Sequence, residues 1–396
     1  MAMLITQGLV AEWLCRGLQI LVCRFDSDPS LHFVIMITNL TLTDFRNHKS
    51  SRINTGGRKN IIITGPNGAG KTAVLEAVSM LAGDRGMRGA QMGEIARFDG
   101  QGGFSVFAHT DFDTDVSVYF GPGDANRHAK IDGENATLGM LAKILRIVWI
   151  TPREDRIFTD SASERRAFFD RMAASFDSAH SGRIARHAKL MSERAAALKN
   201  GANTHWMDAL DEQIAGIAIA IAAGRIQYAG EINYFLNNAA VSVDGMVESW
   251  VIEKNAADAE RAYLAYLKSN RALVYDKMVI DGVNKSDFGV FNKKLNLPTN
   301  LTSTGQQKTC LIELILAHAK LIFTKTGGQP IILFDEAAAH LDADARRNMF
   351  EQLGRVNAQV WATGLEPDVF RDIDDAVFVT CTDGGISNIL LSQEGE

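Results

Sequence analysis

Gly65-Pro66-Asn67-Gly68-Ala69-Gly70-Lys71-Thr72 is a complete GxxxxGK[ST] loop. The apolar run 61–63 precedes it, so the sequence predicts that a strand ends at this loop and that a helix begins after it. The backbone N–H groups of such a loop cradle phosphates, its lysine reaches the terminal phosphates, and its hydroxyl ligates Mg²⁺. We therefore predict that Gly65, Pro66, Asn67, Gly68, Ala69, Gly70, Lys71 and Thr72 bind a nucleotide, with Lys71 also catalytic and Thr72 on the metal.

A second apolar run, 331–334, ends in Asp335 and Glu336. Two carboxylates at the end of a strand suit the metal shell and the polarisation of an attacking water. A pair of this kind is equally typical of a solvated strand end, but the phosphate loop earlier in the chain favours the catalytic interpretation. We assign Asp335 to Mg²⁺ and Glu336 to the water as catalytic base, and we expect ATP and Mg²⁺ as cofactors.

A third motif, Ser303-Thr304-Gly305-Gln306, lies upstream of the acidic run and opens a predicted helix at 307–320. Alone it is a polar turn, but the order of phosphate loop, long insertion, S-x-G-Q turn and acidic strand is typical of ATP-binding cassettes. In that class the turn of one subunit meets the γ-phosphate held by the other. The sequence therefore predicts an ATP-dependent homodimer, in which Ser303, Thr304, Gly305 and Gln306 act in trans and Asp342, in the loop 339–342, senses the partner.

Further segments carry a resemblance to a known family: ITNLTLTDFRNH at 37–48, Ile150-Thr151-Pro152 with ERRAFFD at 164–170, and Lys285-Ser286-Asp287-Phe288. From Met36 onward the chain resembles the RecF family of bacterial recombination mediators, relatives of the SMC ATPase heads. The resemblance implies an α/β fold of the ABC/SMC ATPase-head type, with a mixed sheet and helices and an inserted helical second lobe or short arm. It also places Arg46 and Asn47 beside the nucleotide, although an exposed turn is the alternative.

The function implied by this resemblance is that of a recombination mediator. A protein of the RecF type is expected to be a weak, DNA-stimulated ATPase whose ATP-driven homodimer clamps gapped or junction DNA, single-stranded or duplex. It would act with RecO and RecR to load RecA in repair and replication restart. The motifs leave other options open: an SMC-like or ABC-type head with another partner, including a transporter subunit, and a purely structural head that does not hydrolyse ATP.

Two positions depart from the pattern of related heads. Many cassettes have a switch histidine after the strand that follows the acidic one, whereas this sequence offers Thr363. A threonine donates a hydrogen bond but carries no charge. Where SMC-type heads have a glutamine loop, residues 151–155 contain no Gln. Glu154 is there either a metal or water contact or a solvated acid.

The length and composition bound the domain count. At 396 residues with 46% hydrophobic content, the chain can bury one large core and part of a second. We predict an ATPase lobe at 36–160 and 295–396 and an inserted, mainly helical lobe or arm at 161–294. Residues 1–35 lack the regions of a signal peptide and are expected to be a non-native extension.

The formal net charge of −6 does not exclude DNA binding, which needs only a local basic patch. Arg183, Arg186 and Lys189 share one helix face, and the basic run continues through Arg194 and Lys199. A solvated helix face is the alternative to DNA contact.

The cysteines Cys15, Cys23, Cys310 and Cys381 show no metal-site spacing. No apolar run approaches the length of a transmembrane helix. We therefore expect a cytoplasmic protein with reduced thiols and no membrane partner.

Overall fold

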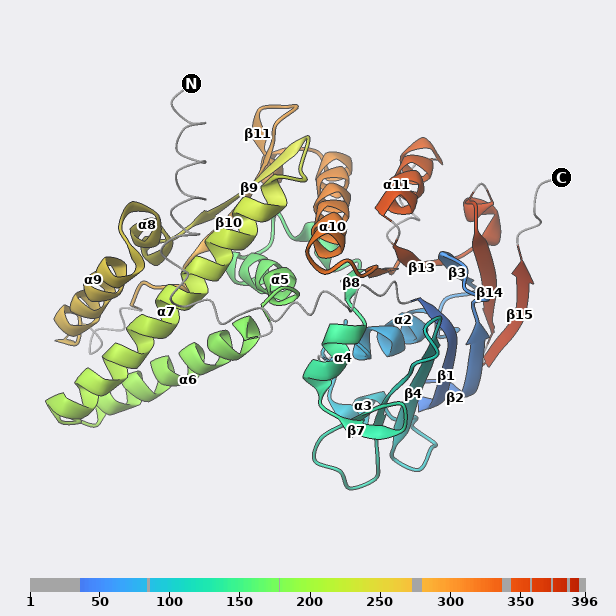
Figure 1. Cartoon of the computed structure of the whole chain (residues 1–396), viewed down its shortest axis with the longest axis horizontal. Helices are drawn as coiled ribbons and strands as arrows, with labels where there is room; N and C mark the ends of the chain where they lie inside the picture. Colours follow the sequence, from blue (N-terminus) through green and yellow to red (C-terminus); the bar gives the residue numbers. More distant parts are fainter. Residues whose placement is uncertain are drawn as a thin grey trace. The chain divides into compact units, whose positions relative to one another are not determined.

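Two compact units make up the described part of the chain, which comprises residues 36–83, 86–177, 179–272, 280–336, 343–356, 358–371, 373–382 and 385–391 of the computed structural model (Figure 1). One unit contains residues 157–310, and the other contains residues 36–156 together with those from 311 onward. This division gives 295–310 to the unit of the insertion, whereas these residues were expected in the ATPase lobe. The reason is that β11 (Leu297–Pro298) pairs with β10 (Asp287–Asn292) inside that unit.

The phosphate-loop strand lies inside a six-stranded sheet of order β15-β14-β3-β13-β12-β8. All neighbours are parallel except β15, which runs antiparallel to β14. The apolar runs of β3, β8 and β12 are buried, as expected for parallel strands. The strands are β3 (Asn60–Thr64), β8 (Ile147–Ile150), β12 (Ile331–Phe334), β13 (Gln359–Gly364), β14 (Ala376–Thr382) and β15 (Gly385–Leu391).

Helices connect the strands of this sheet. The helix α2 (Lys71–Met80) follows β3 through the phosphate loop, as the sequence predicts. The helix α10 (Thr304–Thr326) leads into β12, and α11 (Ala343–Val356) precedes β13. Two 3₁₀ turns follow strands of the same sheet, η2 (Glu154–Arg156) and η5 (Pro367–Phe370).

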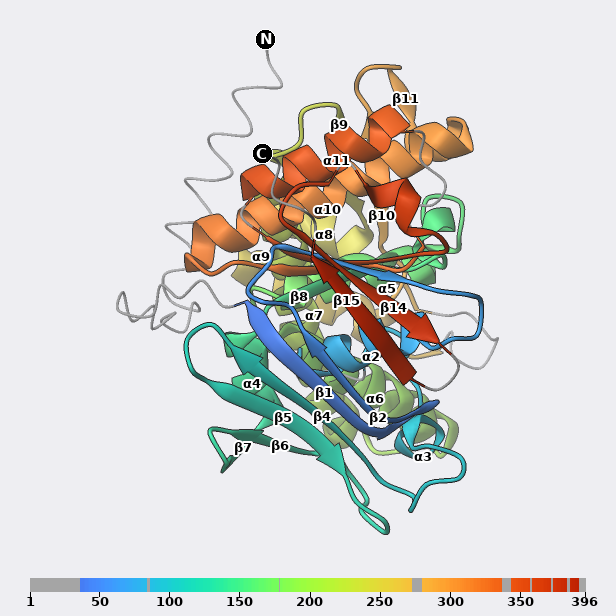
Figure 2. The same ribbon diagram turned by 90° about the vertical axis from the view of Figure 1, so that its right-hand side faces the viewer.

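A second, antiparallel sheet has the order β2-β1-β4-β5-β6-β7 (Figure 2). Its strands and short helices are β1 (Ile37–Phe45), β2 (His48–Asn54), β4 (Phe104–Thr110), β5 (Asp115–Phe120), β6 (His128–Ile131), β7 (Glu134–Ala136), α3 (Met92–Ile95) and α4 (Leu138–Ile144). The segment that begins the family resemblance forms β1, and a register shift between Ile37 and Asn39 explains why its buried positions depart from strict alternation. One core cluster joins both sheets and α2 through side chains such as Leu40, Ile63 and Val78.

The unit at 157–310 is mainly helical, with a small sheet of order β11-β10-β9. Its elements are α5 (Ala162–Ala174), α6 (His180–Lys199), α7 (Thr204–Asn233), β9 (Ala239–Asp244), α8 (Met246–Glu253), α9 (Ala256–Ser269) and η4 (Thr299–Leu301), besides β10, β11 and the start of α10. The side chains of Ser161, Asn203 and Asn255 cap α5, α7 and α9 by accepting a backbone N–H. The apolar face of α7 forms the centre of this unit's core.

No helix in the described part of the chain combines the length and the apolar content that a bilayer crossing needs.

The basic run on α6 is not one continuous basic face. Arg194 is buried and donates to Asp211 Oδ1 at 2.6 Å and to the Leu267 carbonyl at 2.7 Å. Its position, five residues after Lys189, turns it away from the face that Arg186 and Lys189 share. Arg194, although it belongs to the basic run in the sequence, is therefore a core ion-pair residue and available neither to DNA nor to solvent.

This buried pair gives a test of the inserted unit. The carboxylate of Asp211 accepts from Arg194 and also from Arg271 Nε, the latter at 2.8 Å. Asp211→Asn therefore leaves the buried Arg194 without its carboxylate. We expect a loss of about 3–5 kcal/mol in the free energy of unfolding, measured by urea denaturation. The control Glu193→Gln removes a half-exposed carboxylate from the same helix as Arg194 and should change the free energy of unfolding by less than about 0.5 kcal/mol. Equal effects of the two substitutions would contradict this assignment.

Candidate nucleotide site

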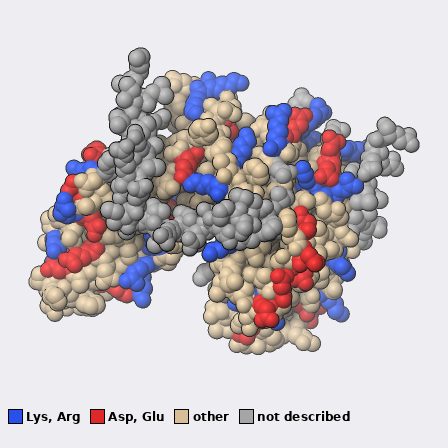
Figure 3. Space-filling view, viewed as in Figure 1, with Lys and Arg blue, Asp and Glu red and all other residues tan. Residues whose placement is uncertain are grey.

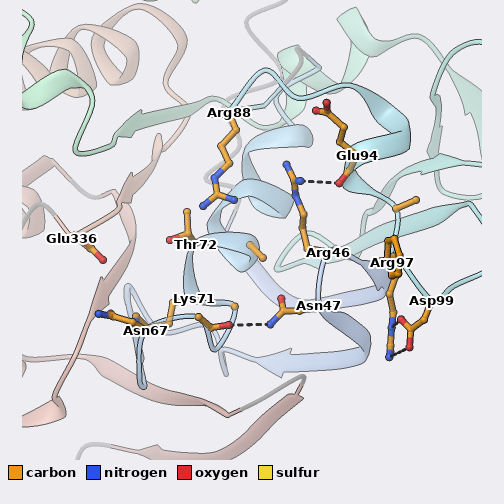
Figure 4. Close-up of a pocket in the computed structure, with 15 residues that line it drawn as sticks. Arg46, Asn47, Asn67, Lys71, Thr72, Arg88, Glu94, Arg97, Asp99 and Glu336 are labelled. Carbon is orange, nitrogen blue, oxygen red and sulfur yellow. Dashed lines mark hydrogen bonds and ion pairs between the residues drawn. The ribbon is translucent and has the colours of Figure 1, made fainter.

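A cavity of about 810 Å³ lies beside the phosphate loop. Figure 4 shows Thr72, Lys71 and Asn67 at its centre, with Glu336 on one side and Arg97 and Asp99 on the other. The lining residues are Arg46, Asn47, Asn67, Gly68, Gly70, Lys71, Thr72, Ala73, Arg88, Glu94, Ala96, Arg97, Phe98, Asp99 and Glu336. Of the predicted loop residues, Gly65, Pro66 and Ala69 are not in this lining.

The backbone of the phosphate loop needs glycine. Gly70 is the N-cap of α2 with φ of 100°, and no side chain caps the N–H groups of the first turn. A Cβ at Gly70 would lie 2.5 Å from His48 Nε2. His48 is buried, and its Nε2 lies 3.2 Å from the Gly70 carbonyl, to which it donates. The loop is therefore seated on His48, and the uncapped N–H groups of α2 remain available to an anion.

Lys71 is held inside the loop. Its ammonium donates to the carbonyls of Gly65 at 2.7 Å and Pro66 at 2.9 Å, and the side chain is buried. These contacts give Gly65 and Pro66 a role although they do not line the cavity. An ammonium has three donors, so one remains for a phosphate oxygen.

Two threonine hydroxyls connect the acidic residues with the phosphate loop and with each other. Thr72 Oγ1 donates to Asp335 Oδ1 at 3.0 Å, and Thr363 Oγ1 donates to the same oxygen at 2.9 Å. The Thr363 hydroxyl in turn accepts the backbone N–H of Glu336 at 2.9 Å. Thr363 is thus buried and links the Asp335 carboxylate to the backbone of Glu336. This structural role differs from the one expected of a switch histidine.

The electrostatics around Asp335 fit a cation. Burial raises the pKa of its carboxyl, and the charge of Glu336 adds to this, while the hydroxyls of Thr363 and Thr72 oppose it. Among the described residues, no group of three or more His, Cys, Asp or Glu is arranged to hold a metal. Mg²⁺ in a phosphate-loop site needs no such group, because one hydroxyl, one carboxylate, phosphates and waters complete its octahedron. Thr72 and Asp335 fit that donor set.

Glu336 has φ of +54°, in the left-handed region. That conformation costs a non-glycine residue about 1–2 kcal/mol, and strain of this kind clusters at functional sites. Glu336 lines the cavity, on the side opposite Arg97 and Asp99 (Figure 4).

Arg46 lies in the turn between β1 and β2, with φ of +52°. Its Nε and Nη2 donate to the Glu76 carboxylate at 2.9 and 2.6 Å, and its Nη1 donates to the Glu94 carbonyl at 2.8 Å. Glu76 is buried in α2, and Arg88 lies 3.7 Å from the same carboxylate. One buried acid therefore holds two arginines at the cavity. Asn47, the next residue, donates to the Gly68 carbonyl at 3.5 Å.

Glu76, Arg88 and His48 belong to the site, but the sequence motifs did not predict them. The signals were present: Glu76 is an acid within an apolar helix, and His48 ends the motif that contains Arg46.

Glu154 has a structural role in the turn after β8. It is buried and accepts the backbone N–H of Thr151 at 2.8 Å, so the solvated-acid alternative is wrong, and Glu154 closes the turn after β8.

The S-x-G-Q turn belongs to the unit at 157–310. Ser303 N–H donates to Gln306 Oε1 at 3.0 Å, and Gln306 N–H donates to Ser303 Oγ at 3.4 Å, a reciprocal capping box at the start of α10. Ser303, Thr304, Gly305 and Gln306 are all exposed. Asp342 lies outside the described residues, so its role remains a prediction.

Comparisons with known proteins agree on one family. The family model described as RecF/RecN/SMC N terminal domain matches residues 36–388. The DNA replication and repair protein RecF of Rhizobium rhizogenes (strain K84) is 34% identical over 372 residues, which cover 89% of this chain and 98% of that protein. The protein of the same name from Brucella suis biovar 1 is 34% identical over 374 residues, covering 90% and 97%.

Solved structures show the same fold. A structure of the recombination mediator protein RecF-ATPrS in the RecFOR pathway has a TM-score of 0.77 at 20% identity, and covers 89% of this chain and 98% of that one. The corresponding RecF-ATP structure has a TM-score of 0.72 at 20% identity, covering 89% and 99%.

The fold and the site together define an ATPase head of the ABC/SMC class, which confirms the predicted fold class. The chain belongs to the RecF family of DNA replication and repair proteins, and the resemblance drawn from the motifs is confirmed.

The shared acid at the cavity gives a test. Glu76→Gln keeps the shape of the side chain but removes the charge that holds Arg46 and Arg88. Because hydrogen bonds to charged groups contribute about 1.5–3 kcal/mol, we expect a loss of that size in the free energy of unfolding, measured by urea denaturation. Glu94→Gln is the matched control, since only the backbone carbonyl of Glu94 contacts Arg46. A loss in the control as large as in Glu76→Gln would contradict this role.

Proposed function

We propose that the chain is an ATP-dependent recombination mediator that binds ATP with Mg²⁺ in the phosphate-loop cavity, hydrolyses it, and uses ATP to close a homodimer on DNA. The observation that carries this proposal is the linked arrangement of Thr72, Asp335 and Glu336 beside the phosphate loop. Membership of the RecF family supports it.

Binding of the triphosphate falls to three kinds of donor. The uncapped N–H groups at the start of α2 face the phosphate loop, Lys71 has one donor beyond those used by Gly65 and Pro66, and Arg46 keeps donors beyond those bound to Glu76 and Glu94. A guanidinium has five N–H groups in a planar fork that matches phosphate oxygens. Lys71 and Arg46 are therefore held in position for phosphate contact before the nucleotide binds.

Hydrolysis requires a base next to the metal position. Glu336 accepts the proton of the attacking water in our proposal, and the Thr363 hydroxyl fixes the backbone of Glu336 relative to Asp335. Bound Mg²⁺ supplies charge neutralisation and alignment of the phosphates. Thr72 and Asp335 are the residues that would hold it. The strained backbone at Glu336 is consistent with a carboxylate held for this task.

The exposed S-x-G-Q turn supports the proposed homodimer. Ser303 to Gln306 form a preorganised, exposed helix start, and such a start binds anions. In our proposal the turn of one copy meets the γ-phosphate held by the other, so that each site is complete only in the dimer and ATP links the two.

DNA and protein partners are proposed from the relatives. Proteins of this family are named for DNA replication and repair, and the solved relatives are described within the RecFOR pathway. We propose that gapped or junction DNA is the substrate of the clamp and that RecO and RecR are the partners. On the face shown in Figure 3, Lys and Arg side chains lie among Asp and Glu, so DNA contact would rest on local sets such as Arg186 and Lys189. Family membership favours this reading over a transporter subunit.

Two substitutions test the site. Lys71→Ala should raise the Kd for ATP about tenfold to a hundredfold, because it removes a charge-assisted contact. Glu336→Gln should bind ATP within about threefold of wild type yet hydrolyse it at least about a hundredfold more slowly with gapped DNA present. Calorimetry gives the first quantity and phosphate release the second.

The matched control is Glu366→Gln, an exposed acid after β13 that does not line the cavity. It should change neither the Kd nor the rate. A Glu336→Gln variant with wild-type hydrolysis would remove Glu336 as the base, and unchanged ATP affinity in Lys71→Ala would contradict the assignment of the phosphate loop.

A further inference from the structure

Phe98 is the most exposed large hydrophobic side chain among the described residues, at 104% relative exposure. It lies in the lining of the phosphate-loop cavity. An exposed phenylalanine keeps its whole apolar surface in water, and burying it against a ligand is favourable. A ligand in this cavity that presents a flat apolar face would bury the ring of Phe98.

The backbone that carries Phe98 is anchored, although the ring is not packed. Arg97 N–H donates to the Asp44 carbonyl at 2.8 Å, and Arg46 N–H donates to the Ile95 carbonyl at 2.7 Å. Phe45 and Ala96 form a bridge between the same two segments. The segment with Phe98 is therefore fixed to the β1–β2 turn that presents Arg46 to the cavity.

The order of groups along the cavity sets what reaches Phe98. Figure 4 shows Glu336 and Thr72 on one side, Arg97 and Asp99 on the other, and Asn47 between them. A nucleotide with its terminal phosphate near Thr72 and Glu336 would direct its nucleoside past Asn47 toward the segment 97–99. Phe98 lies between the labelled Arg97 and Asp99 in the sequence.

We propose that Phe98 is the platform on which the base of the bound nucleotide stacks. This inference rests on the proposed nucleotide site and adds its base-binding part. A phenyl ring offers only a π face, and every base has one, so stacking alone is tolerant of base identity. The neighbouring polar side chains are engaged with each other, because Arg97 Nε and Nη2 donate to the Asp99 carboxylate at 2.5 and 2.8 Å. The subsite therefore takes nucleotides without strict discrimination between their bases.

The test compares diphosphates, which separate the base from the terminal phosphate and from dimer closure. The Kd values for ADP, GDP and inorganic pyrophosphate, each with Mg²⁺, are measured by calorimetry on the full chain. Phe98→Ala should raise the Kd for ADP and GDP alike by roughly tenfold, the scale of base stacking on an aromatic ring. In Phe98→Ala, the Kd for pyrophosphate should stay within twofold of the wild-type value. Phe98→Tyr keeps an aromatic ring and should bind ADP with wild-type affinity.

Phe112→Ala is the matched control, because Phe112 is also exposed, at 42%, but does not line the cavity. It should leave all three Kd values unchanged. An unaltered ADP affinity in Phe98→Ala, or an equal loss for pyrophosphate, overturns the stacking platform while leaving the proposed function intact. Loss of ATP-dependent dimerisation with normal ADP binding would also overturn it and assign Phe98 to the partner copy. Failure of the wild type to bind any of these ligands would contradict both proposals.

Discussion

The strand order β3-β13-β12 is the constraint on which the site depends. The phosphate loop follows β3, Thr363 lies in β13, and Asp335 follows β12. Because these neighbours are parallel and in register, with Thr363 opposite Ile63 and Phe334 opposite Ala362, their carboxyl ends meet at one edge of the sheet. Ligands of open α/β sheets bind at that edge. The hydrogen bonds of Asp335 to Thr72 and Thr363 then follow from the topology.

The site carries features that stability alone would not favour. Arg46 and Glu336 have positive φ, and the Asp335 carboxyl is buried with its pKa raised by that burial. Each is supported by a neighbour: Glu76 holds Arg46, and the Thr363 hydroxyl joins Asp335 to the backbone of Glu336. Strain and buried charge at a cavity, with their supports, are the pattern of a functional site.

Much of this could be predicted from the sequence, because local motifs carry it. The phosphate loop, the acidic strand and the S-x-G-Q turn are contiguous segments whose chemistry follows from residue type and spacing. The links between segments could not be predicted. Glu76 and Arg46 are thirty residues apart, and Thr363 and Asp335 are twenty-eight apart, so no spacing rule connects them.

One member of the basic run on α6 is buried, which the sequence pattern could not predict. Arg194 continues this run in the sequence, but its partner Asp211 lies on the next helix, α7. An ion pair between two helices cannot be recognised from the residue pattern of either helix. The grouping of 295–310 with the helical unit has the same physical origin, because the pairing of β11 with β10 is a contact between short segments of weak pattern.

The central claim is that ATP completes its site across two copies of the chain. Light scattering of the full chain with ATP and Mg²⁺, with and without gapped DNA, tests it most directly when wild type is compared with Ser303→Arg. Our account predicts a monomer-to-dimer shift that requires ATP, is favoured by DNA, and is abolished by Ser303→Arg because Ser303 is exposed and its replacement leaves the phosphate loop untouched. A wild type that remains monomeric under every condition, or a Ser303→Arg variant that dimerises equally well, would contradict it.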